Sequence, residues 1–437
     1  MGRVKVMYWS EKQECMSRHE IEQTQLSCLK KTIERVYQNV PFYKERLDSV
    51  NLHPEKITSL SDLQEVPFTT KEDIRMHYPY GLFAAPMKKI VRVHASSGTT
   101  GKPTVVGYTK NDIDTWANLV ARIVMMAGGT EDDVAQVSFG YGLFTGAFGL
   151  HYGLEKIGAT VVPISSGNTE KQVMLMKDFG TTLLVSTPSY ALYIAEVAQE
   201  MGLNKEEFNL RIGLFGAEGS TEEMRNELEE RLGILATENY GLSEIIGPGV
   251  SGECTFKTGM HIAEDHFIPE IIDPDTGKVL PWGEKGELVI TTITKEGFPL
   301  LRYRTKDITA LTNERCKCGR TMARMEKVQG RTDDMLIIKG VNVFPSQIES
   351  VLIGMEHIGP HYQMIVKKKG YFDTLEVHVE LIDGNMLEKF SELEKLEGEI
   401  YHRLKSTLGL DAKVKLVEPK SIERSMGKAK RVIDLRK

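Results

Sequence analysis

The stretch His94-Ala95-Ser96-Ser97-Gly98-Thr99-Thr100-Gly101-Lys102-Pro103 combines small hydroxylated residues, two glycines and one lysine. Glycine lets the backbone approach a ligand closely, so that successive N–H groups can point at one anion, while hydroxyls and a lysine add donors and a charge. The stretch therefore predicts a loop that binds phosphate. A serine- and glycine-rich surface turn has the same composition and is the alternative interpretation.

This loop differs from the Walker loop of nucleoside triphosphatases. A Walker loop places four residues between its glycines and has Ser or Thr directly after its lysine. Here two residues separate Gly98 from Gly101, and Pro103 follows Lys102. Because a residue that precedes proline is biased away from the helical region, we expect the chain to leave the loop as a strand over residues 104–108 rather than as a helix.

The composition of the chain excludes several classes of function. The 437 residues carry a net charge of −6, so no general basic field favours nucleic acid or anionic lipid as a partner. No apolar run approaches the roughly 18 residues of a membrane span, and the N-terminus has no apolar signal core. We therefore expect a cytoplasmic protein that binds neither nucleic acid nor membrane.

Apolar periodicity indicates an α/β protein. Residues 1–90 are expected to be mainly helical. Between about residues 130 and 240, strand-like runs alternate with helical runs, which predicts mainly parallel sheets flanked by helices. The expected strands are 134–139, 159–164, 182–186 and 212–215, and the expected helices are 170–179, 189–201 and 221–232. Ser220, with Glu223 three residues later, is expected to cap the last of these helices.

The pattern changes again in the second half of the chain. Short strands with turns after Asp265 predict a small barrel-like β region. Residues 331–437 then predict a small α+β domain with a helix that begins at Pro345 and a final strand at 414–417. The expected organisation is a large N-terminal domain over residues 1–330 and a small mobile C-terminal domain over residues 331–437.

Five segments match, in order, the signatures of the adenylate-forming acyl-CoA synthetase superfamily. They are Ser96-Ser97-Gly98-Thr99-Thr100-Gly101-Lys102-Pro103, Asn239-Tyr240-Gly241-Leu242-Ser243-Glu244, Tyr303-Arg304-Thr305-Lys306-Asp307, Gly330-Arg331-Thr332-Asp333-Asp334 and Ser425-Met426-Gly427-Lys428. Within that superfamily, residues 66–73, 139–146 and 340–345 resemble phenylacetate-CoA ligases. The resemblance favours the phosphate loop over the surface turn.

The resemblance implies a reaction in two steps. An aryl or arylacetic acid, with phenylacetate as the expected substrate, would react with ATP and Mg²⁺ to form an acyl adenylate and pyrophosphate, and coenzyme A would then displace AMP. Transfer to a carrier-protein thiol or an amine is the nearest alternative, and a catalytically silent nucleotide- or metal-binding protein is another. The presence of Lys428, Glu244 and Asp307 argues against a silent protein. The resemblance also implies a homodimer.

It further implies roles for individual residues. Lys428 would bridge the substrate carboxylate and the α-phosphate, Glu244 would bind Mg²⁺, Asp307 would accept the ribose hydroxyls, and Asp333 would be the hinge of the C-terminal domain. The other implied nucleotide-binding residues are Ser96, Ser97, Gly98, Thr99, Thr100, Gly101 and Lys102 at the phosphates, Gly216, Ala217 and Glu218 at the adenine, Tyr240 stacked on the base, and Asn239, Gly241 and Arg331. Lys71 is a further candidate for the phosphates.

A glycine- and aromatic-rich stretch at residues 139–146 predicts the acyl pocket. It directly follows an expected parallel strand, where ligands gather in open α/β sheets, and its aromatic rings could wall a flat apolar substrate. Packing of these aromatics into the core is the alternative. The candidates are Tyr141, Phe144, Gly146 and Ala147.

Cysteine spacing predicts a structural zinc ion. Cys316 and Cys318 lie in a turn-rich region, and closely spaced thiols in a cytoplasmic protein more often bind metal than form a disulfide. A structural zinc has four ligands, and the other two candidates are Cys254 and His261, with His266 as a substitute for His261. Unpaired thiols in a loop are the alternative.

Overall fold

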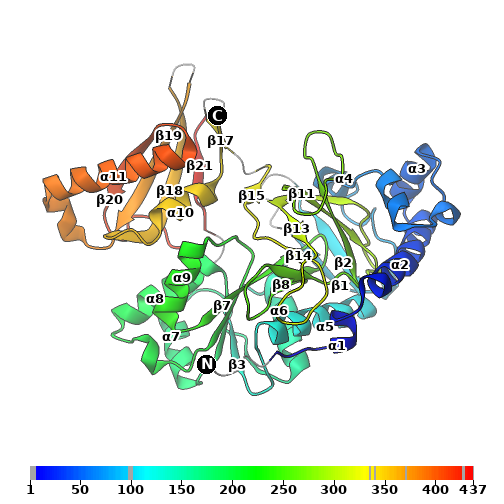
Figure 1. The fold of residues 1–437 in the computed structure, drawn as a ribbon. Coiled ribbons are helices and arrows are strands. Elements are labelled where there is room, and N and C mark those ends of the chain that lie inside the picture. The colour runs from blue at the N-terminus through cyan, green and yellow to red at the C-terminus, as the bar shows by residue number, and fades with distance from the viewer. Residues whose placement is uncertain are drawn as a thin grey trace.

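The structure is a computed structural model that describes residues 6–96, 102–333, 336–338, 341–369, 372–425 and 429–436. It consists of a large α/β domain and a separate C-terminal domain, which lies above α8 (Pro188–Glu200) and α9 (Glu222–Leu232) in Figure 1. The expected α/β class is confirmed.

The N-terminal region is helical, as its apolar spacing predicts. Its helices are α1 (Glu11–Glu14), α2 (Arg18–Asn39), α3 (Pro41–Ser49) and α4 (Lys71–Met76). Ser17 caps α2 by accepting a hydrogen bond from the Glu20 N–H. Leu29, Ile33 and Val36 lie on one face of α2 and are fully buried, so this face joins the core of the large domain.

A mixed sheet forms the centre of the large domain, with strand order β13-β14-β9-β8-β7-β6-β5-β3-β4. Neighbouring strands are parallel from β4 to β7 and antiparallel from β7 to β13. The strands are β3 (Val134–Val137), β4 (Thr160–Val162), β5 (Leu183–Ser186), β6 (Ile212–Phe215), β7 (Leu235–Leu242), β8 (Gly247–Glu253), β9 (Met260–Ile262), β13 (Leu311–Thr312) and β14 (Arg324–Met325). α5 (Lys110–Met126) precedes β3, and the helices between the strands from β3 to β7 are α6 (Gly146–Ile157), α7 (Thr169–Asp178), α8 and α9. The strands and helices predicted between residues 130 and 240 are confirmed, with small differences at their ends.

The start of α9 differs from the prediction by one residue. Thr221 is the N-cap, and its hydroxyl accepts a hydrogen bond from the Met224 N–H at 3.2 Å. The Ser220 hydroxyl donates instead to the carboxylate of Glu238 on β7. The predicted capping box is therefore wrong, because a tertiary partner engages the side chain that the local pattern assigned to the cap.

Two smaller sheets complete the large domain. β1 (Ile90–Ala95) and β2 (Val105–Thr109) form an antiparallel hairpin. The region expected to be barrel-like is an antiparallel sheet of β10 (Phe267–Ile272), β11 (Gly286–Thr292), β12 (Tyr303–Thr309) and β15 (Gly330–Arg331), with β10 and β15 at its edges.

The C-terminal domain has its own apolar core. It contains β16 (Leu336–Ile338), β17 (Val341–Val343), α10 (Pro345–Leu352), β18 (Ile358–Lys369), β19 (Phe372–Leu381), α11 (Phe390–Leu408), β20 (Ala412–Val417) and β21 (Val432–Asp434), and its main sheet has the order β20-β19-β18-β21. The prediction that residues 414–417 form the last strand is wrong, since β21 pairs in parallel with β18. A strand of three residues is too short to show an alternating apolar pattern.

Ion pairs and apolar packing join the two domains. Glu196 on α8 accepts hydrogen bonds from His361 at 3.1 Å and from Arg424 at 3.0 Å, both in the C-terminal domain. Burial raises the pKa of Glu196, but these two hydrogen bonds outweigh it and lower the pKa to about 2. Ile353 packs into the apolar cluster of α7, α8 and α9. The relative position of the domains thus rests on defined side-chain contacts.

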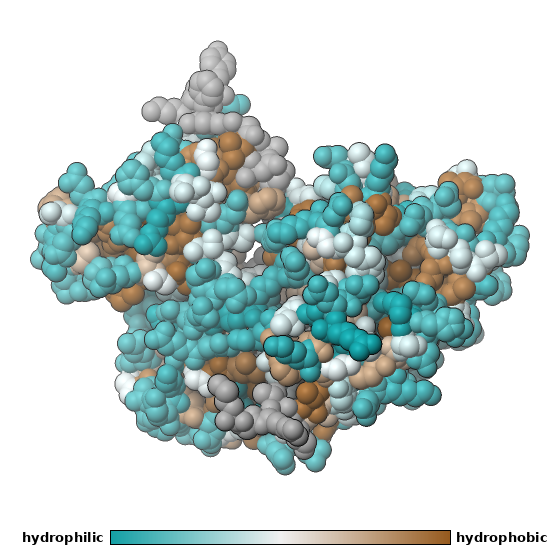
Figure 2. Space-filling view, in the orientation of Figure 1, coloured by the Kyte–Doolittle hydropathy of each residue, from teal (hydrophilic) through white to brown (hydrophobic). Residues whose placement is uncertain are grey.

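Hydrophilic side chains predominate on the face shown in Figure 2, and apolar ones are scattered among them. Such scattered apolar groups are usual on a protein surface. Among the described residues, no helix has both the length and the apolar character needed to span a membrane.

Candidate functional site

The candidate phosphate loop connects β1 to β2. Ala95 pairs with Val105, and the loop is closed at its base because the Ser96 N–H donates to the Thr104 carbonyl at 3.0 Å and the Thr104 N–H donates to Ser96 Oγ at 3.0 Å. The strand expected after Pro103 is confirmed. Lys102 Nζ lies over the ring of Tyr78, 5.5 Å from its centroid. The other loop candidates, Ser97, Gly98, Thr99, Thr100 and Gly101, lie outside the described residues.

Glu244 lies at the base of this loop, in the turn that follows β7. Its Oε1 accepts a hydrogen bond from Thr104 Oγ1 at 3.2 Å and lies 3.6 Å from Lys71 Nζ. The Glu244 side chain is only 8% exposed. Carboxylate oxygens are ligands that Mg²⁺ prefers, so a carboxylate beside a phosphate loop fits a magnesium ion that is shared with a nucleotide.

Tyr240, Asp307 and Arg331 form a hydrogen-bonded group across β7, β12 and β15. The Tyr240 hydroxyl donates to Asp307 Oδ2 at 2.6 Å, and Arg331 Nη1 donates to Asp307 Oδ1 at 3.0 Å. Burial raises the pKa of Asp307, although the Arg331 guanidinium opposes the shift. A carboxylate has about four lone-pair sites, so Asp307 can still accept bonds from a diol. Arg331 also binds Asp333, with Nε 2.8 Å from Oδ1, at the start of the C-terminal domain.

The adenine candidates lie at the end of β6, beside β7. A Cβ atom at Gly216 would lie 2.7 Å from the Asn239 carbonyl oxygen, so only glycine fits there. Asn239 also donates from Nδ2 to the Phe215 carbonyl at 2.8 Å. On β7, a Cβ atom at Gly241 would lie 1.8 Å from the Gly247 oxygen. Close backbone approach therefore requires glycine at both positions.

Glu218 links the large domain to the C-terminal segment. Its Oε1 accepts the N–H of Ser189 at the start of α8 at 2.8 Å, and its Oε2 accepts the N–H of Ala429 at 3.0 Å. The preceding residue, Ala217, has a φ of +69°. Lys428 itself lies outside the described residues, but the residue after it is thus bonded to the large domain.

The candidate acyl loop, residues 139–146, contacts both the end of β1, which leads into the phosphate loop, and the turn that carries Glu244. The Leu143 carbonyl accepts the Ala95 N–H at 3.0 Å, and the Thr145 and Ser243 hydroxyls are hydrogen-bonded at 2.9 Å. The structure therefore brings this loop to the same end of the sheet as the nucleotide candidates.

The acyl-pocket candidates differ in their surroundings. Phe144 is 54% exposed, whereas Ala147 is fully buried in the core of the large domain. Tyr141 packs against that core, and its hydroxyl is hydrogen-bonded to His151 Nδ1 at 3.0 Å. Gly146 begins α6. The alternative interpretation, packing into the core, explains the position of Ala147 and the buried part of the Tyr141 side chain.

Lys295 is a residue near the site that the sequence motifs do not include. It is 3% exposed, and its Nζ donates to the carbonyl oxygens of Glu244 at 3.3 Å and Ile245 at 2.5 Å. Burial lowers the pKa of Lys295 to about 7, although Asp112 and Glu244 oppose the shift. The sequence offered little signal for it, because Lys295 stands between Thr294 and Glu296, directly after a run of apolar residues and threonines at 288–294.

This buried lysine predicts a pH dependence of stability. The pKa of Lys295 is about 7 in the folded chain and about 10.4 in an unfolded one. Between these values only the unfolded state binds the proton, so the free energy of unfolding should rise with pH by up to about 1.4 kcal/mol per pH unit from this group. Lys295→Met should remove this contribution. Urea unfolding of both proteins between about pH 7.5 and about pH 9.5 measures the two slopes, and equal slopes would contradict the expectation.

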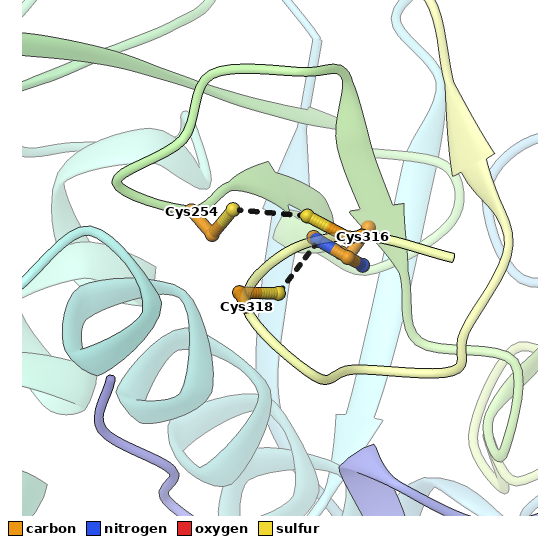
Figure 3. Close-up of side chains that lie close together, drawn as sticks. Cys254, Cys316 and Cys318 are labelled. Carbon is orange, nitrogen blue, oxygen red and sulfur yellow. Dashed lines mark hydrogen bonds between the residues drawn. The ribbon is translucent and has the colours of Figure 1, made fainter. Parts of the chain in front are cut away.

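The four metal candidates meet in one buried cluster. The ligand atoms of Cys254, His261, Cys316 and Cys318 all lie within 4.8 Å of one another, and Figure 3 shows the three cysteines pointing toward one another. Cys254 and Cys316 sulfurs are 3.7 Å apart, and Cys318 Sγ lies 3.4 Å from His261 Nε2. Three thiols and one imidazole are a donor set of structural zinc sites.

The neighbouring histidine lies outside this cluster. His266 Nδ1 is hydrogen-bonded to Thr294 Oγ1 at 2.8 Å, and its Nε2 lies 3.4 Å from Asp265. The structure therefore selects His261 over His266 as the fourth member of the cluster.

Comparison with known proteins identifies the family. Residues 33–294 match the family described as AMP-binding enzyme, and residues 340–436 match the AMP-binding enzyme C-terminal domain. The chain is 50% identical to a phenylacetate-coenzyme A ligase of Escherichia coli (strain K12), with 97% of each chain covered. It is 48% identical to a phenylacetate-coenzyme A ligase of Thermus thermophilus, with 99% of this chain and 100% of the relative covered.

Solved structures show the same architecture. A 2-hydroxyisobutyryl-CoA ligase in the postadenylation state, in complex with 2-HIB-AMP, is 30% identical and has a TM-score of 0.92, with 98% of this chain and 92% of that chain covered. For the same ligase with 2-HIB-AMP and CoA in the thioesterification state, at the same identity and coverage, the TM-score is 0.72. From its sequence matches and this architecture, the chain belongs to the AMP-binding enzyme family and is an AMP-forming acid–CoA ligase.

Proposed function

We propose that this enzyme joins phenylacetate, or a closely related aryl acid, to coenzyme A through an acyl adenylate. The observation that supports this most is the meeting of the phosphate-loop base, Glu244 and the Tyr240–Asp307–Arg331 group around the end of β7. The choice of acid rests on the relatives named above. Those relatives are named coenzyme A ligases, and this chain matches nearly their full length. Coenzyme A is therefore favoured over a carrier protein or an amine as the acceptor.

The residues of the site would act mainly by binding and orientation. Phosphoryl-transfer chemistry depends on positioning and on stabilisation of charge at the phosphates. The backbone of the loop 96–102 and Lys71 would hold the β- and γ-phosphates, Asp307 the ribose hydroxyls, and residues 216–218 with Tyr240 the adenine. Glu244 would hold Mg²⁺, which when bound neutralises charge on the phosphate oxygens.

The domain arrangement is proposed to be the adenylating one. Its support is the higher TM-score to the postadenylation state than to the thioesterification state of the same ligase. In this arrangement the Ala429 N–H donates to Glu218 of the large domain at 3.0 Å, which supports a role for the C-terminal segment in adenylation. We propose that the domains divide at residues 330–331 and that Asp333 is the hinge.

The products of the reaction test the proposed function. With ATP, coenzyme A and phenylacetate, we expect AMP and pyrophosphate to form in equal amounts with the acyl-CoA, because the family motifs support attack at the α-phosphate. Chromatography of the nucleotides and a pyrophosphate assay across a panel of aryl acids, with and without coenzyme A, provide the measurement. Stoichiometric ADP would contradict the mechanism, and sustained turnover only with an amine or a carrier protein would identify another acceptor.

We also propose that Cys254, His261, Cys316 and Cys318 hold a structural Zn²⁺. All four residues are buried, and a closed four-ligand site leaves no position for substrate. The loop that carries Cys316 and Cys318 also binds the N-terminal segment: the Tyr8 hydroxyl donates to the Cys318 carbonyl at 2.6 Å, and Arg320 Nε donates to Glu14 at 2.6 Å. The ion would thus hold together chain segments that are remote in the sequence.

The homodimer that the family resemblance implies and the cytoplasmic location expected from the sequence are part of the proposal. Light scattering coupled to size-exclusion chromatography would measure the mass of the native particle, and cell fractionation would locate it.

A further inference from the structure

A buried lysine holds the turn from which Glu244 projects. Lys295 lies in the loop after β11, and its Nζ donates to two successive carbonyl oxygens, those of Glu244 at 3.3 Å and Ile245 at 2.5 Å. The same Nζ lies 4.7 Å from the ring centroid of Tyr108 and 5.3 Å from that of Phe298. The amino group is therefore enclosed by two aromatic rings and two carbonyl oxygens.

Other elements hold the same turn at its ends. The Tyr108 hydroxyl, on β2, donates to the Ile246 carbonyl at 3.1 Å. The Ser243 hydroxyl is hydrogen-bonded to that of Thr145 at 2.9 Å, next to the start of α6. Groups from β2 and the β11 loop therefore bind the backbone carbonyls of this turn, and the acyl loop binds the Ser243 side chain just before Glu244. Since β2 begins directly after the phosphate loop, these contacts set the position of Glu244 relative to that loop.

We propose that Lys295 is a positioning residue for adenylation, which holds the turn after β7 so that the Glu244 carboxylate faces the phosphate loop. This inference rests on the proposed role of Glu244 in the adenylation step. Lys295 touches no reacting group and acts only through the turn. Without its amino group, two buried carbonyl oxygens would lose their donor, and such groups are costly to leave unpaired. The turn would shift to find other partners, and displacement of a catalytic group by about 1 Å can cost about 10²-fold in rate.

A purely structural role predicts a different outcome. If Lys295 only fills the core, its loss should weaken the whole domain and damage both half-reactions alike. If it positions Glu244, the loss should be confined to adenylation and to the binding of magnesium-bound nucleotide, because attack of coenzyme A on a preformed acyl adenylate does not use that carboxylate.

The test compares Lys295→Met with Lys285→Met. The second variant removes an exposed lysine just before β11, the strand that Lys295 follows. We expect Lys295→Met to lower the rate of ATP–pyrophosphate exchange by about 10- to 100-fold and to raise the Mg²⁺ concentration that gives half of the maximal rate. Thioester formation from a supplied acyl adenylate should stay within about twofold, as expected for an interaction made in only one step. By calorimetry, the affinity for ATP with Mg²⁺ should fall, and that for ATP with a chelator should not. Lys285→Met should change none of these quantities.

Two results would overturn the inference: an equal loss in both half-reactions, or unchanged exchange and Mg²⁺ dependence. Glu244→Gln separates these from a failure of the proposed function. If Glu244→Gln leaves exchange and Mg²⁺ dependence unchanged, the role of Glu244 is wrong, and the inference about Lys295 falls with it. If Glu244→Gln abolishes exchange but Lys295→Met does not alter it, only the inference fails.

A second variant keeps the test decisive if Lys295→Met does not fold. Tyr108→Phe removes one hydroxyl from the same turn and leaves the ring in place. It should lower exchange by about 3- to 10-fold, the effect of one hydrogen bond, with the same rise in the Mg²⁺ requirement and no loss of thioester formation. Unchanged exchange and Mg²⁺ dependence in Tyr108→Phe would then overturn the inference.

Discussion

Lys428→Ala is expected to lower the rate of adenylation by about 10²- to 10³-fold, the usual effect of removing one preorganised group that stabilises developing charge. The lysine would neutralise the α-phosphate and the substrate carboxylate only while the C-terminal domain is in the adenylating arrangement. Attack of coenzyme A on a supplied acyl adenylate should therefore continue at close to the normal rate. ATP–pyrophosphate exchange and thioester formation from the isolated adenylate measure the two steps separately.

Lys430→Ala is the matched control, because Lys430 is exposed and lies two residues away in the same segment. It should leave both steps unchanged. Equal losses in the two half-reactions of Lys428→Ala would show that the lysine does not act in one arrangement alone, and would contradict the alternation of domains about Asp333.

Removal of the cysteine pair at residues 316 and 318 is expected to abolish metal binding and to destabilise the large domain. Metal analysis should find about one zinc ion per native chain and none in the double variant Cys316→Ser, Cys318→Ser. Because a structural zinc contributes directly to folding, we expect a loss of at least about 3 kcal/mol in the free energy of unfolding. Adenylation at low temperature should change far less, since the cluster holds no reacting group.

The contacts around the cluster indicate where the variant should open first. The N-terminal segment is bound to the metal-candidate loop by Tyr8 and Glu14, and the Cys15 thiol lies 3.6 Å from the Gly319 oxygen. Limited proteolysis should therefore cleave this segment sooner in the double variant than in the native protein. Cys28→Ser is the control, because Cys28 lies outside the cluster. Native protein that lacks metal and is fully stable would eliminate the zinc proposal.

The secondary structure that depends on neighbours a few residues apart could be read from the sequence. Pro103 predicted that the phosphate loop leads into a strand, and β2 begins at Val105. Pro345 predicted the start of α10, which begins at that residue. Proline restricts its own φ and the backbone of the residue before it, so these predictions need no knowledge of the rest of the fold. The order of the family motifs likewise identified the class of enzyme, because each motif is a short run of residues.

Other features depended on contacts between distant segments. The N-cap of α9 is Thr221 because Ser220 is bound by Glu238 of another element, and β21 became visible only through its pairing with β18. The sequence left His261 and His266 both open, and the position of β9 beside the loop that carries Cys316 and Cys318 decided between them.

Lys295 shows most clearly what cannot be predicted from the sequence alone. By itself, one lysine shortly after a strand is one more charged residue in a loop. Only the packing of the β11 loop against the turn after β7 places its ammonium group on the carbonyl oxygens of Glu244 and Ile245. The sequence determined the local backbone preferences and the types of residue available for chemistry, whereas the tertiary structure decided which of these residues meet. A hydrogen bond between residues about fifty positions apart leaves no local pattern, because it is set by the packing of the elements that carry them.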